Sequence, residues 1–315
     1  MESMKSVRLH QFGGPEVLKH EDAPRPEADE GNVLVRVHAA GVNPVDWKVR
    51  EGRLNQQREH TLPLIPGSEL SGIVAQTGRG VSRVERGDAV YGYLAAIGNG
   101  AYAEYALVRA QDLARKPRSL DHMHAAAVPL AALAAAQGLC GPRALNVTSG
   151  QTVLIHGAAG GVGHFAVQFA KFLGAKVIAT ASTRNLEFLH EIGADVVIDY
   201  TRQRFEDVAR NVDAVFDTVG GDTLSRSWML LRPGGALVST ADLPCASTAR
   251  AKGVRAEMVT TRANATQLET IGRLIDDGIV KPVVSEALPL AQARKAHDLS
   301  QAGHVRGKIV LRVAA

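Results

Sequence analysis

Four glycines separate an apolar run from an apolar pattern of helical spacing in the segment VLIHGAAGGVGHFAVQFAKFLGAKVIATAS. A strand that enters a helix through glycines turns tightly and lets backbone N–H groups approach a phosphate. The spacing here is G-x-x-G-G-x-G rather than G-x-G-x-x-G, and a tight turn without a ligand is the alternative interpretation. The residues expected to contact a bound cofactor at this turn are Gly157, Ala158, Gly160, Gly161, Val162 and Gly163.

The elements around this turn are predicted to form a β-α-β unit. Residues 153–155 are of strand type, and after the glycines apolar residues recur at three- and four-residue spacing as far as Leu173. Gly174 is expected to end that helix, and a second apolar run covers residues 177–181. The unit spans about 30 residues, as a dinucleotide-binding fold requires.

Further apolar runs repeat the pattern along the chain. They cover residues 196–198, 214–216 and 236–238 and alternate with helical segments. This alternation predicts a doubly wound parallel α/β sheet, whose ligands bind beyond the carboxyl ends of the strands. Further cofactor contacts are therefore expected at the strand ends: Asp217, Val219 and Thr240.

The end of the second strand indicates which dinucleotide binds. An NAD enzyme usually has an acidic residue about 20 residues after the glycine motif, whereas a 2′-phosphate is bound by arginine and hydroxyl groups. This chain has Ser182, Thr183 and Arg184 there, with no carboxylate before Glu187. A guanidinium can bind a phosphate with two hydrogen bonds. The sequence therefore favours NADPH, with Tyr200 as a further contact, although the hydroxyls also suit a helix cap.

Composition limits the class of protein. The chain has 315 residues, 45% hydrophobic and 22% charged, which is enough for two globular domains. No apolar run of membrane-spanning length lacks a charge or glycine, and the alanine-rich residues 125–140 are expected to form a buried helix. Two cysteines and an N-terminus without a secretion signal predict a cytoplasmic protein. The charge of +4 is spread out and aromatic residues are 4%, which argues against a nucleic-acid partner.

The first third of the chain differs from this pattern, because short β-type runs alternate with Gly, Pro and Asp turns. Such runs predict a small barrel-like β domain. The end of the chain, VRGKIVLRV, is again strand-like and is expected to return to it. We therefore expect a β domain of residues 1–120 and 263–315 and an NADPH-binding domain of residues 121–262, with the active site between them.

Seven segments occur in a specific order along nearly the whole chain: VHAAGVNPVDWKVREG, IPGSELSGIVAQTG, RGDAVYG, GAYAEYALV, VLIHGAAGGVG, FDTVGG and HVRGKIVL. This order resembles the medium-chain dehydrogenase/reductase superfamily and, within it, the zinc-free quinone oxidoreductase (ζ-crystallin-like) branch, with similarity to alkenal/enone reductases. The resemblance implies a GroES-like β-barrel catalytic domain, a Rossmann domain and a homodimer. It also implies cofactor contacts in the last segment, at Arg306, Gly307 and Lys308.

The ligands for zinc are missing from the sequence. A zinc enzyme that resembles this chain would have a cysteine in place of Asn43 and a histidine in place of Ser68. Its structural zinc would need four closely spaced cysteines, whereas this chain has two, neither of them in the first domain. His122 and His124 are two residues apart and would point apart on a helix. We therefore expect no metal site.

Without a Lewis-acidic metal, oxidation of a simple alcohol loses the usual stabilisation of its alkoxide. Hydride transfer to a conjugated acceptor is easier, because the negative charge spreads to an oxygen that ordinary donors can stabilise. The sequence therefore favours an NADPH-dependent reductase of quinones or α,β-unsaturated carbonyls, with pocket loops such as residues 53–61 and 242–252. Two other functions stay open: a polyketide-type enoyl reductase, and a non-enzymatic NADPH-binding or RNA-binding protein of the crystallin kind.

The resemblance also implies catalytic residues. Asn43 should lie beside the nicotinamide and the reacting carbonyl as a neutral donor, and Lys48 resembles the lysine that approaches the ribose and substrate oxygen in enone reductases. Tyr91 is expected to line the cleft. A turn before Pro44 and a solvated lysine are the structural alternatives for the first two. Ala134 stands where relatives commonly have a threonine near the nicotinamide, so one cofactor contact is lost or replaced.

Overall fold

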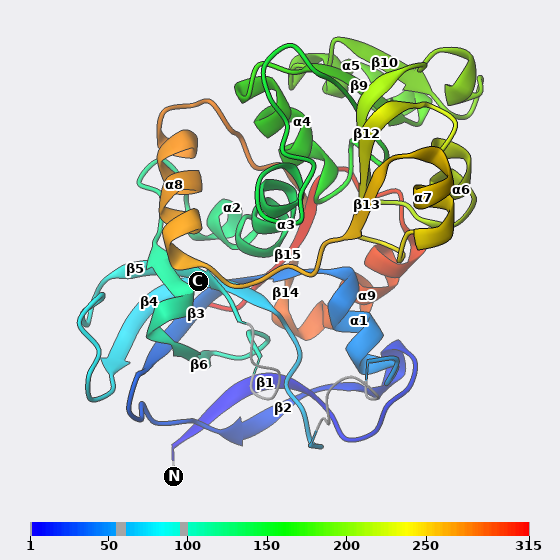
Figure 1. Ribbon diagram of the computed structural model, residues 1–315. Helices are drawn as coiled ribbons and strands as arrows, with labels where there is room; N and C mark the ends of the chain where they lie inside the picture. Colours follow the sequence, from blue (N-terminus) through cyan, green and yellow to red (C-terminus); the bar gives the residue numbers. More distant parts are fainter. Residues whose placement is uncertain (1, 55–60, 95–99, 315) are drawn as a thin grey trace. The chain divides into compact units, whose positions relative to one another are not determined.

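The computed structural model describes residues 2–54, 61–94 and 100–314, which form two compact units (Figure 1). Unit 1 consists of Met1–Leu130, Ala263–Gly278 and Pro282–Ala315, and unit 2 consists of Ala131–Arg262 and Ile279–Lys281. Part of one expected pocket loop, residues 55–60, lies outside the described residues.

Unit 1 is built on a seven-stranded sheet and a two-stranded ribbon. Its strands are β1 (Ser3–Leu9), β2 (Leu18–Pro24), β3 (Asn32–Val42), β4 (Glu69–Thr77), β5 (Ala89–Tyr93), β6 (Tyr105–Arg109), β7 (Leu113–Arg115), β14 (Val284–Pro289) and β15 (Lys308–Arg312). The sheet order is β14-β15-β3-β4-β5-β7, with β6 also paired to β3. The last strand, β15, lies antiparallel to β3, so the end of the chain returns to the first unit (Figure 1).

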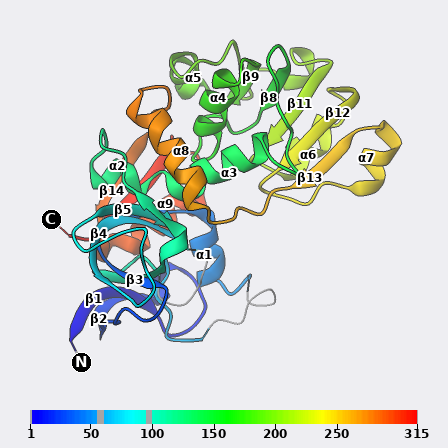
Figure 2. The same cartoon turned by 60° about the vertical axis from the view of Figure 1, so that its left-hand side comes forward.

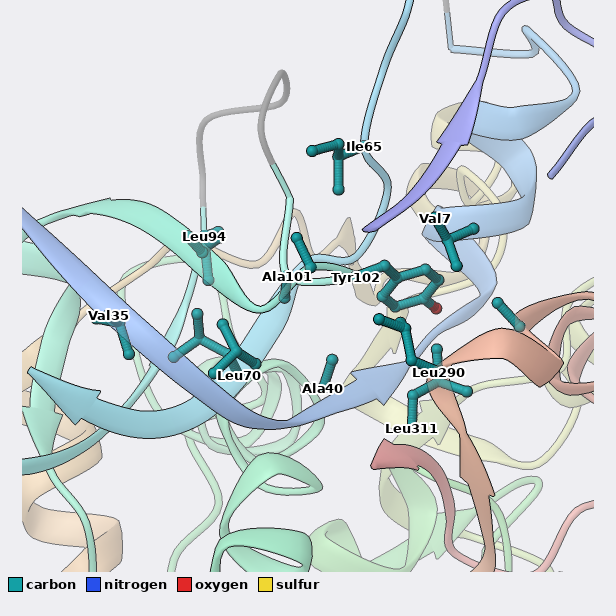
Figure 3. Packing of buried hydrophobic residues seen from close by; sticks show 14 of the residues in the cluster. Val7, Val35, Ala40, Ile65, Leu70, Leu94, Ala101, Tyr102, Leu290 and Leu311 are labelled. Carbon is teal, nitrogen blue, oxygen red and sulfur yellow. The ribbon is translucent and has the colours of Figure 1, made fainter. Parts of the chain in front are cut away.

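Apolar residues of these strands form the core of unit 1. Figure 3 shows Val35 of β3, Leu70 of β4 and Leu311 of β15 in this cluster, and all three side chains are buried. The phenol ring of Tyr102 lies among the same apolar side chains (Figure 3). Its hydroxyl therefore needs a partner inside the unit, and that partner belongs to the candidate site.

In the described part of the chain, unit 1 contains the helices α1 (Pro44–Arg50), α2 (His122–Ala126), α8 (Ala265–Asp276) and α9 (Ala293–Ala302). The last three pack on strands of the unit, and α1 packs on α9. A proline at the first position favours the start of α1, and Asn43 is its N-cap residue. The α2 helix packs against β3 and β4, which places it in unit 1, although the sequence boundary was expected after residue 120. The helix expected over residues 125–140 is divided, because a new helix begins at Pro129.

Unit 2 contains a six-stranded parallel sheet. Its strands are β8 (Thr152–Ile155), β9 (Lys176–Ala181), β10 (Val196–Asp199), β11 (Val212–Asp217), β12 (Leu231–Ser239) and β13 (Arg255–Met258). The order is β10-β9-β8-β11-β12-β13, with the direction of winding reversed beside β8. This order confirms the predicted doubly wound sheet, whose ligands bind at such a reversal.

Helices cover both faces of the parallel sheet. They are α3 (Pro129–Leu139), α4 (Gly163–Phe172), α5 (Leu186–Glu191), α6 (Gly221–Ser227) and α7 (Ala246–Lys252). In Figures 1 and 2, α4 lies on one face and α6 on the other. Short 3₁₀ helices occur in both units. In unit 1 they span Pro15–Val17, Ala110–Asp112 and Leu290–Gln292, and in unit 2 they span Thr183–Asn185 and Phe205–Asp207. No helix in the described part of the chain is both long and apolar enough to cross a membrane.

Candidate active site

The glycine turn after β8 has the backbone geometry of a phosphate site. Gly157 has a φ of 64°, which favours glycine. A Cβ on Gly163 would lie 2.3 Å from the carbonyl oxygen of Gly157, so a side chain there would collide with the turn. The α4 helix begins at Gly163, so the turn leads directly into a helix N-terminus, which attracts anions. The six residues predicted here therefore fit the phosphates of a dinucleotide.

Asp217, at the end of β11, organises the neighbouring loops. Its buried carboxylate accepts hydrogen bonds from the backbone N–H of Val219 at 3.0 Å and from Ser239 Oγ at 2.7 Å. The backbone N–H of Thr240 donates to the carbonyl oxygen of Asp217 at 2.9 Å. The structure thus brings three predicted contact residues together at adjacent strand ends, with Asp217 as the acceptor that fixes the backbone of the other two.

The end of β9 carries the residues predicted to recognise a 2′-phosphate. Ser182 is half-buried, and Thr183 and Arg184 are exposed. The Thr183 hydroxyl donates to Asp199 Oδ2 at 2.6 Å, so this hydroxyl already has an acceptor within unit 2. Hydrogen bonds from Thr183 and then Thr201 lower the pKa of Asp199, which keeps this carboxylate ionised beside the predicted site. Sequence reasoning missed Asp199 because it belongs to the next strand.

Tyr200 follows Asp199 and is 47% exposed, in a position open to a ligand. Arg202 Nε lies 3.6 Å from Asp199 Oδ2, and 74% of the Arg202 side chain is exposed. This guanidinium offsets the Asp199 charge. The end of β9 and the loop after β10 therefore present two arginines, Arg184 and Arg202, and a phenol to solvent, which suits an additional phosphate.

In unit 1 a buried polar cluster surrounds Asn43. Its side-chain Nδ2 donates to Glu69 Oε1 at 2.8 Å, and its Oδ1 accepts a hydrogen bond from Lys308 Nζ. Lys308 Nζ and Glu69 Oε1 are 2.8 Å apart. All three residues are at most 3% exposed. We call Asn43, Glu69 and Lys308 the amide clamp; it combines residues from the start of α1, β4 and β15.

Lys308 differs from the cofactor contact that was predicted for it. Its ammonium has three N–H donors, and the three acceptors nearest to it are Asn43 Oδ1, Glu69 Oε1 and the carbonyl oxygen of Val42 at 3.2 Å. These contacts leave no donor for a cofactor. The nearby Arg306 is exposed, whereas Gly307 is buried with a φ of 61°, and a Cβ on it would lie 2.3 Å from the carbonyl oxygen of Val283. The contacts predicted for Arg306 and Gly307 stay predictions.

A second buried carboxylate lies beside the amide clamp. Asp46 accepts hydrogen bonds from the backbone N–H of Asn43 at 2.8 Å, from Ser68 Oγ at 2.6 Å and from the Tyr102 hydroxyl at 3.1 Å. Burial raises the pKa of Asp46 to about 6, because the hydrogen bond from Ser68 only partly offsets the loss of solvent. Asp46 therefore titrates close to neutral pH.

The other two predicted catalytic residues lie on different elements. Lys48 is half-buried on α1, and its Nζ lies 5.7 Å from the centre of the Trp47 ring. The Tyr91 hydroxyl donates to the carbonyl oxygen of Leu268 in α8 at 2.6 Å, and the Tyr91 side chain is fully buried. Tyr91 therefore joins β5 to α8, and the structure does not support its predicted role in lining a cleft. Burial also raises the pKa of its hydroxyl, so it stays neutral.

The histidines of α2 make separate contacts. His122 Nδ1 lies 2.8 Å from Ser71 Oγ, and its ring stacks on His38. His124 Nδ1 lies 2.8 Å from Asp121 Oδ1, at the helix start. Among the residues described, no group of three or more His, Cys, Asp or Glu side chains is placed to hold a metal ion.

The family models match both halves of the chain. Residues 29–118 match the family described as alcohol dehydrogenase GroES-like domain, and residues 192–311 match the one described as zinc-binding dehydrogenase. The NADPH-dependent alkenal/one oxidoreductase of the Arabidopsis thaliana chloroplast is 35% identical; the alignment covers 98% of this chain and 79% of the relative.

The chain is also similar to solved structures of quinone oxidoreductases. The quinone oxidoreductase of Coxiella burnetii superposes with a TM-score of 0.92 at 36% identity, covering 99% of this chain and 100% of that chain. The Escherichia coli quinone oxidoreductase, solved in complex with NADPH, gives a TM-score of 0.88 at 28% identity, covering 98% and 99%. These similarities extend over both units and are not limited to the common parallel sheet.

Proposed function

This chain belongs to the medium-chain dehydrogenase/reductase superfamily, and from that membership we propose that it is an NADPH-dependent reductase of quinones or α,β-unsaturated carbonyls. The observation that carries the proposal is the Asn43 amide, held between Glu69 and Lys308 where a zinc relative would have a metal ligand. A neutral donor at this position suits an acceptor whose developing charge is delocalised.

The residues of unit 2 fit the cofactor. The glycine turn leads directly into the N-terminus of α4, where backbone N–H groups and the helix dipole favour a phosphate. Arg184 and Arg202 offer exposed guanidinium groups for the 2′-phosphate of the ribose. When bound, NADPH supplies the hydride. The chain's own task is to hold the substrate carbonyl and to stabilise the charge that reaches its oxygen.

We assign this task to Asn43 and Lys48. One Nδ2 hydrogen of Asn43 is engaged by Glu69, and the second is the donor offered to the substrate oxygen. Lys48 adds a charged donor from the same helix, so it can hold an enolate or hydroquinone oxygen before a proton arrives from solvent. Zinc has no role in this proposal. A cytoplasmic location and a homodimer complete it as expectations.

A turnover screen tests the proposal. The purified full chain is assayed with NADPH or NADH against a naphthoquinone, a short-chain enone and an enoyl thioester, with Asn43→Ala as the matched site variant. We expect NADPH-dependent turnover of the quinone or the enone, and about 100-fold less with Asn43→Ala. A preference for the thioester would favour the polyketide-type enoyl reductase. Tight NADPH binding without turnover of any substrate would favour the non-enzymatic alternative.

A further inference from the structure

The amide clamp contains a buried ion pair, formed by Glu69 and Lys308. Glu69 is fully buried and Lys308 is 3% exposed, so both charges have lost nearly all their solvent. Removing two charges from water is costly, and apolar residues of similar volume often serve the fold as well or better. Apolar side chains of β3, β4 and β15 form the core of the same unit. A buried pair of this kind therefore calls for a role beyond packing.

The contacts that Glu69 and Lys308 make with Asn43 determine the orientation of its side-chain amide. Glu69 can only accept hydrogen bonds and Lys308 can only donate them. The carboxylate therefore selects the NH₂ end of the amide, and the ammonium selects its oxygen. A rotation of the amide by 180° would place its oxygen against the carboxylate and its NH₂ against the ammonium. The reversed orientation is thus excluded from both sides.

The two charged residues are themselves fixed. The second oxygen of Glu69 accepts a hydrogen bond from the backbone N–H of Leu130 at 2.7 Å, at the start of α3. A Cβ on Gly41 would lie 2.2 Å from Glu69 Oε1, so the carboxylate rests directly on the backbone of β3. The remaining donor of Lys308 is engaged by the carbonyl oxygen of Val42. Neither charge can move away from the amide without leaving a backbone group unpaired.

We propose that Glu69 and Lys308 are positioning residues for the reduction: together they hold the Asn43 amide so that its second N–H faces the substrate oxygen. This inference rests on the proposed function, and it gives Lys308 a role different from a cofactor contact. The contribution of a hydrogen-bond donor to the reaction rate depends strongly on its position, because a shift of about 1 Å can lower the rate roughly 100-fold.

The direct test is an NMR measurement of the Asn43 side-chain amide in the cofactor-free full chain. Selective ¹⁵N-asparagine labelling resolves side-chain NH₂ signals, and the pair from Asn43 is identified by its loss in Asn43→Ala. We expect two well-separated and slowly exchanging proton signals in the wild type. Lys308→Met should merge or broaden them. Lys295→Met, which removes an exposed lysine of α9, is the matched control and should leave them unchanged.

Lys308→Met leaves the Glu69 charge buried without its partner, so this variant can fail to fold. The double variant Glu69→Gln/Lys308→Met removes both charges and keeps similar volumes, and it should fold. For the folded variants we expect kcat for the quinone or enone to fall about 100-fold. The NADPH dissociation constant, measured by fluorescence titration, should stay within twofold of the wild type.

The outcomes separate the inference from the proposed function. Unchanged Asn43 signals together with wild-type kcat in the double variant would overturn the inference while leaving the reductase intact. An NADPH affinity that falls in parallel with kcat would also overturn it, because Lys308 would then be a cofactor contact. A wild-type chain that reduces no quinone or enone would contradict the proposed function, whatever the amide signals show.

Discussion

At the scale of the residue, Asn43 combines a neutral donor with charged neighbours. An amide is a weaker donor than an ammonium, but it carries no net charge and needs no proton transfer to act. The ion pair of Glu69 and Lys308 orients it without adding net charge. The site can therefore offer a delocalised oxygen anion a donor that carries no charge of its own. We expect Lys48 to provide the charge-assisted hydrogen bond.

Lys48→Met tests this division of roles. The methionine keeps most of the apolar stem and removes the charge, so folding and NADPH binding should survive. A lost donor to the developing anion should lower kcat by about 100-fold. Steady-state kinetics on an enone and a quinone measure the effect, with Lys295→Met as the control. A kcat within twofold of the wild type on every substrate would assign Lys48 to the surface.

Arg184→Ala tests the choice of cofactor. Removing one charge-assisted contact to the 2′-phosphate should cost about 1.5 to 3 kcal/mol, roughly 10- to 100-fold in NADPH affinity. NADH lacks that phosphate and should bind almost as before. Fluorescence titration gives both dissociation constants, and Arg210→Ala removes another exposed arginine of unit 2 as a control. Equal weakening of both cofactors would contradict the assignment of Arg184.

At the scale of the element, α1 is fixed from both sides. Its last residue, Arg50, is fully buried and donates to His297 Nδ1 of α9 at 3.3 Å and to the carbonyl oxygen of Gly13. His297 must then carry its proton on Nε2, which lies 3.3 Å from the Tyr102 hydroxyl. Burial and Arg50 lower the pKa of His297 to about 3, so it stays neutral. Because the hydroxyl in turn donates to Asp46, this chain of donors fixes the helix that carries Lys48.

The titration of Asp46 should appear in the pH dependence of stability. Its pKa rises from 3.8 to about 6 on folding, so the folded chain binds the proton more tightly. The stabilisation is complete below about pH 4 and is lost as the pH rises through 6, a loss of roughly 3 kcal/mol. The difference in unfolding free energy between the wild type and Asp46→Asn should therefore shrink or reverse between pH 4.5 and 7.5. Urea unfolding measures it, and a constant difference would refute the raised pKa.

Two glycines of the same turn should respond differently to a methyl group. A Cβ at Gly163 would lie 2.3 Å from the Gly157 oxygen, whereas one at Gly160 would lie 3.2 Å from that atom. Gly163→Ala should therefore cost about 1 to 3 kcal/mol of stability. Gly160→Ala should cost less. Urea midpoints and the NADPH dissociation constant compare the two variants, and equal losses of stability would contradict this account of the turn.

Local patterns explain why most elements could be predicted. The apolar runs of β8 to β12 and the spacing in α4 follow from residues close in sequence. The short β13 was missed because its four residues include Arg255 and Glu257, which interrupt any apolar run. The division before α3 depends on Pro129, which favours the first position of a new helix. The amide clamp could not be predicted, because Glu69 and Lys308 meet only when β15 pairs with β3 and β3 with β4.

At the scale of the whole molecule, the two units supply separate parts of the chemistry. Unit 2 has the glycine turn and the exposed arginines that fit a dinucleotide, and unit 1 has the amide clamp. Every residue of the clamp comes from unit 1, although β15 lies at the end of the chain. The return of the chain after unit 2 is therefore needed to complete the site as well as the sheet.

The clamp also leads to a prediction about metal. A divalent cation at the Asn43 position would lie beside the Lys308 ammonium, which contacts the Asn43 oxygen, and the two positive charges would repel each other. Ser68, which stands where a zinc relative has histidine, already donates to Asp46. We therefore expect the purified chain to contain far less than one zinc per molecule by mass spectrometry of the metal, and to keep its full reductase activity after exhaustive chelation. Added zinc should not raise kcat. One tightly bound zinc per chain, with activity that is lost on its removal and restored on its return, would show that the amide clamp is not the group that stabilises the substrate oxygen.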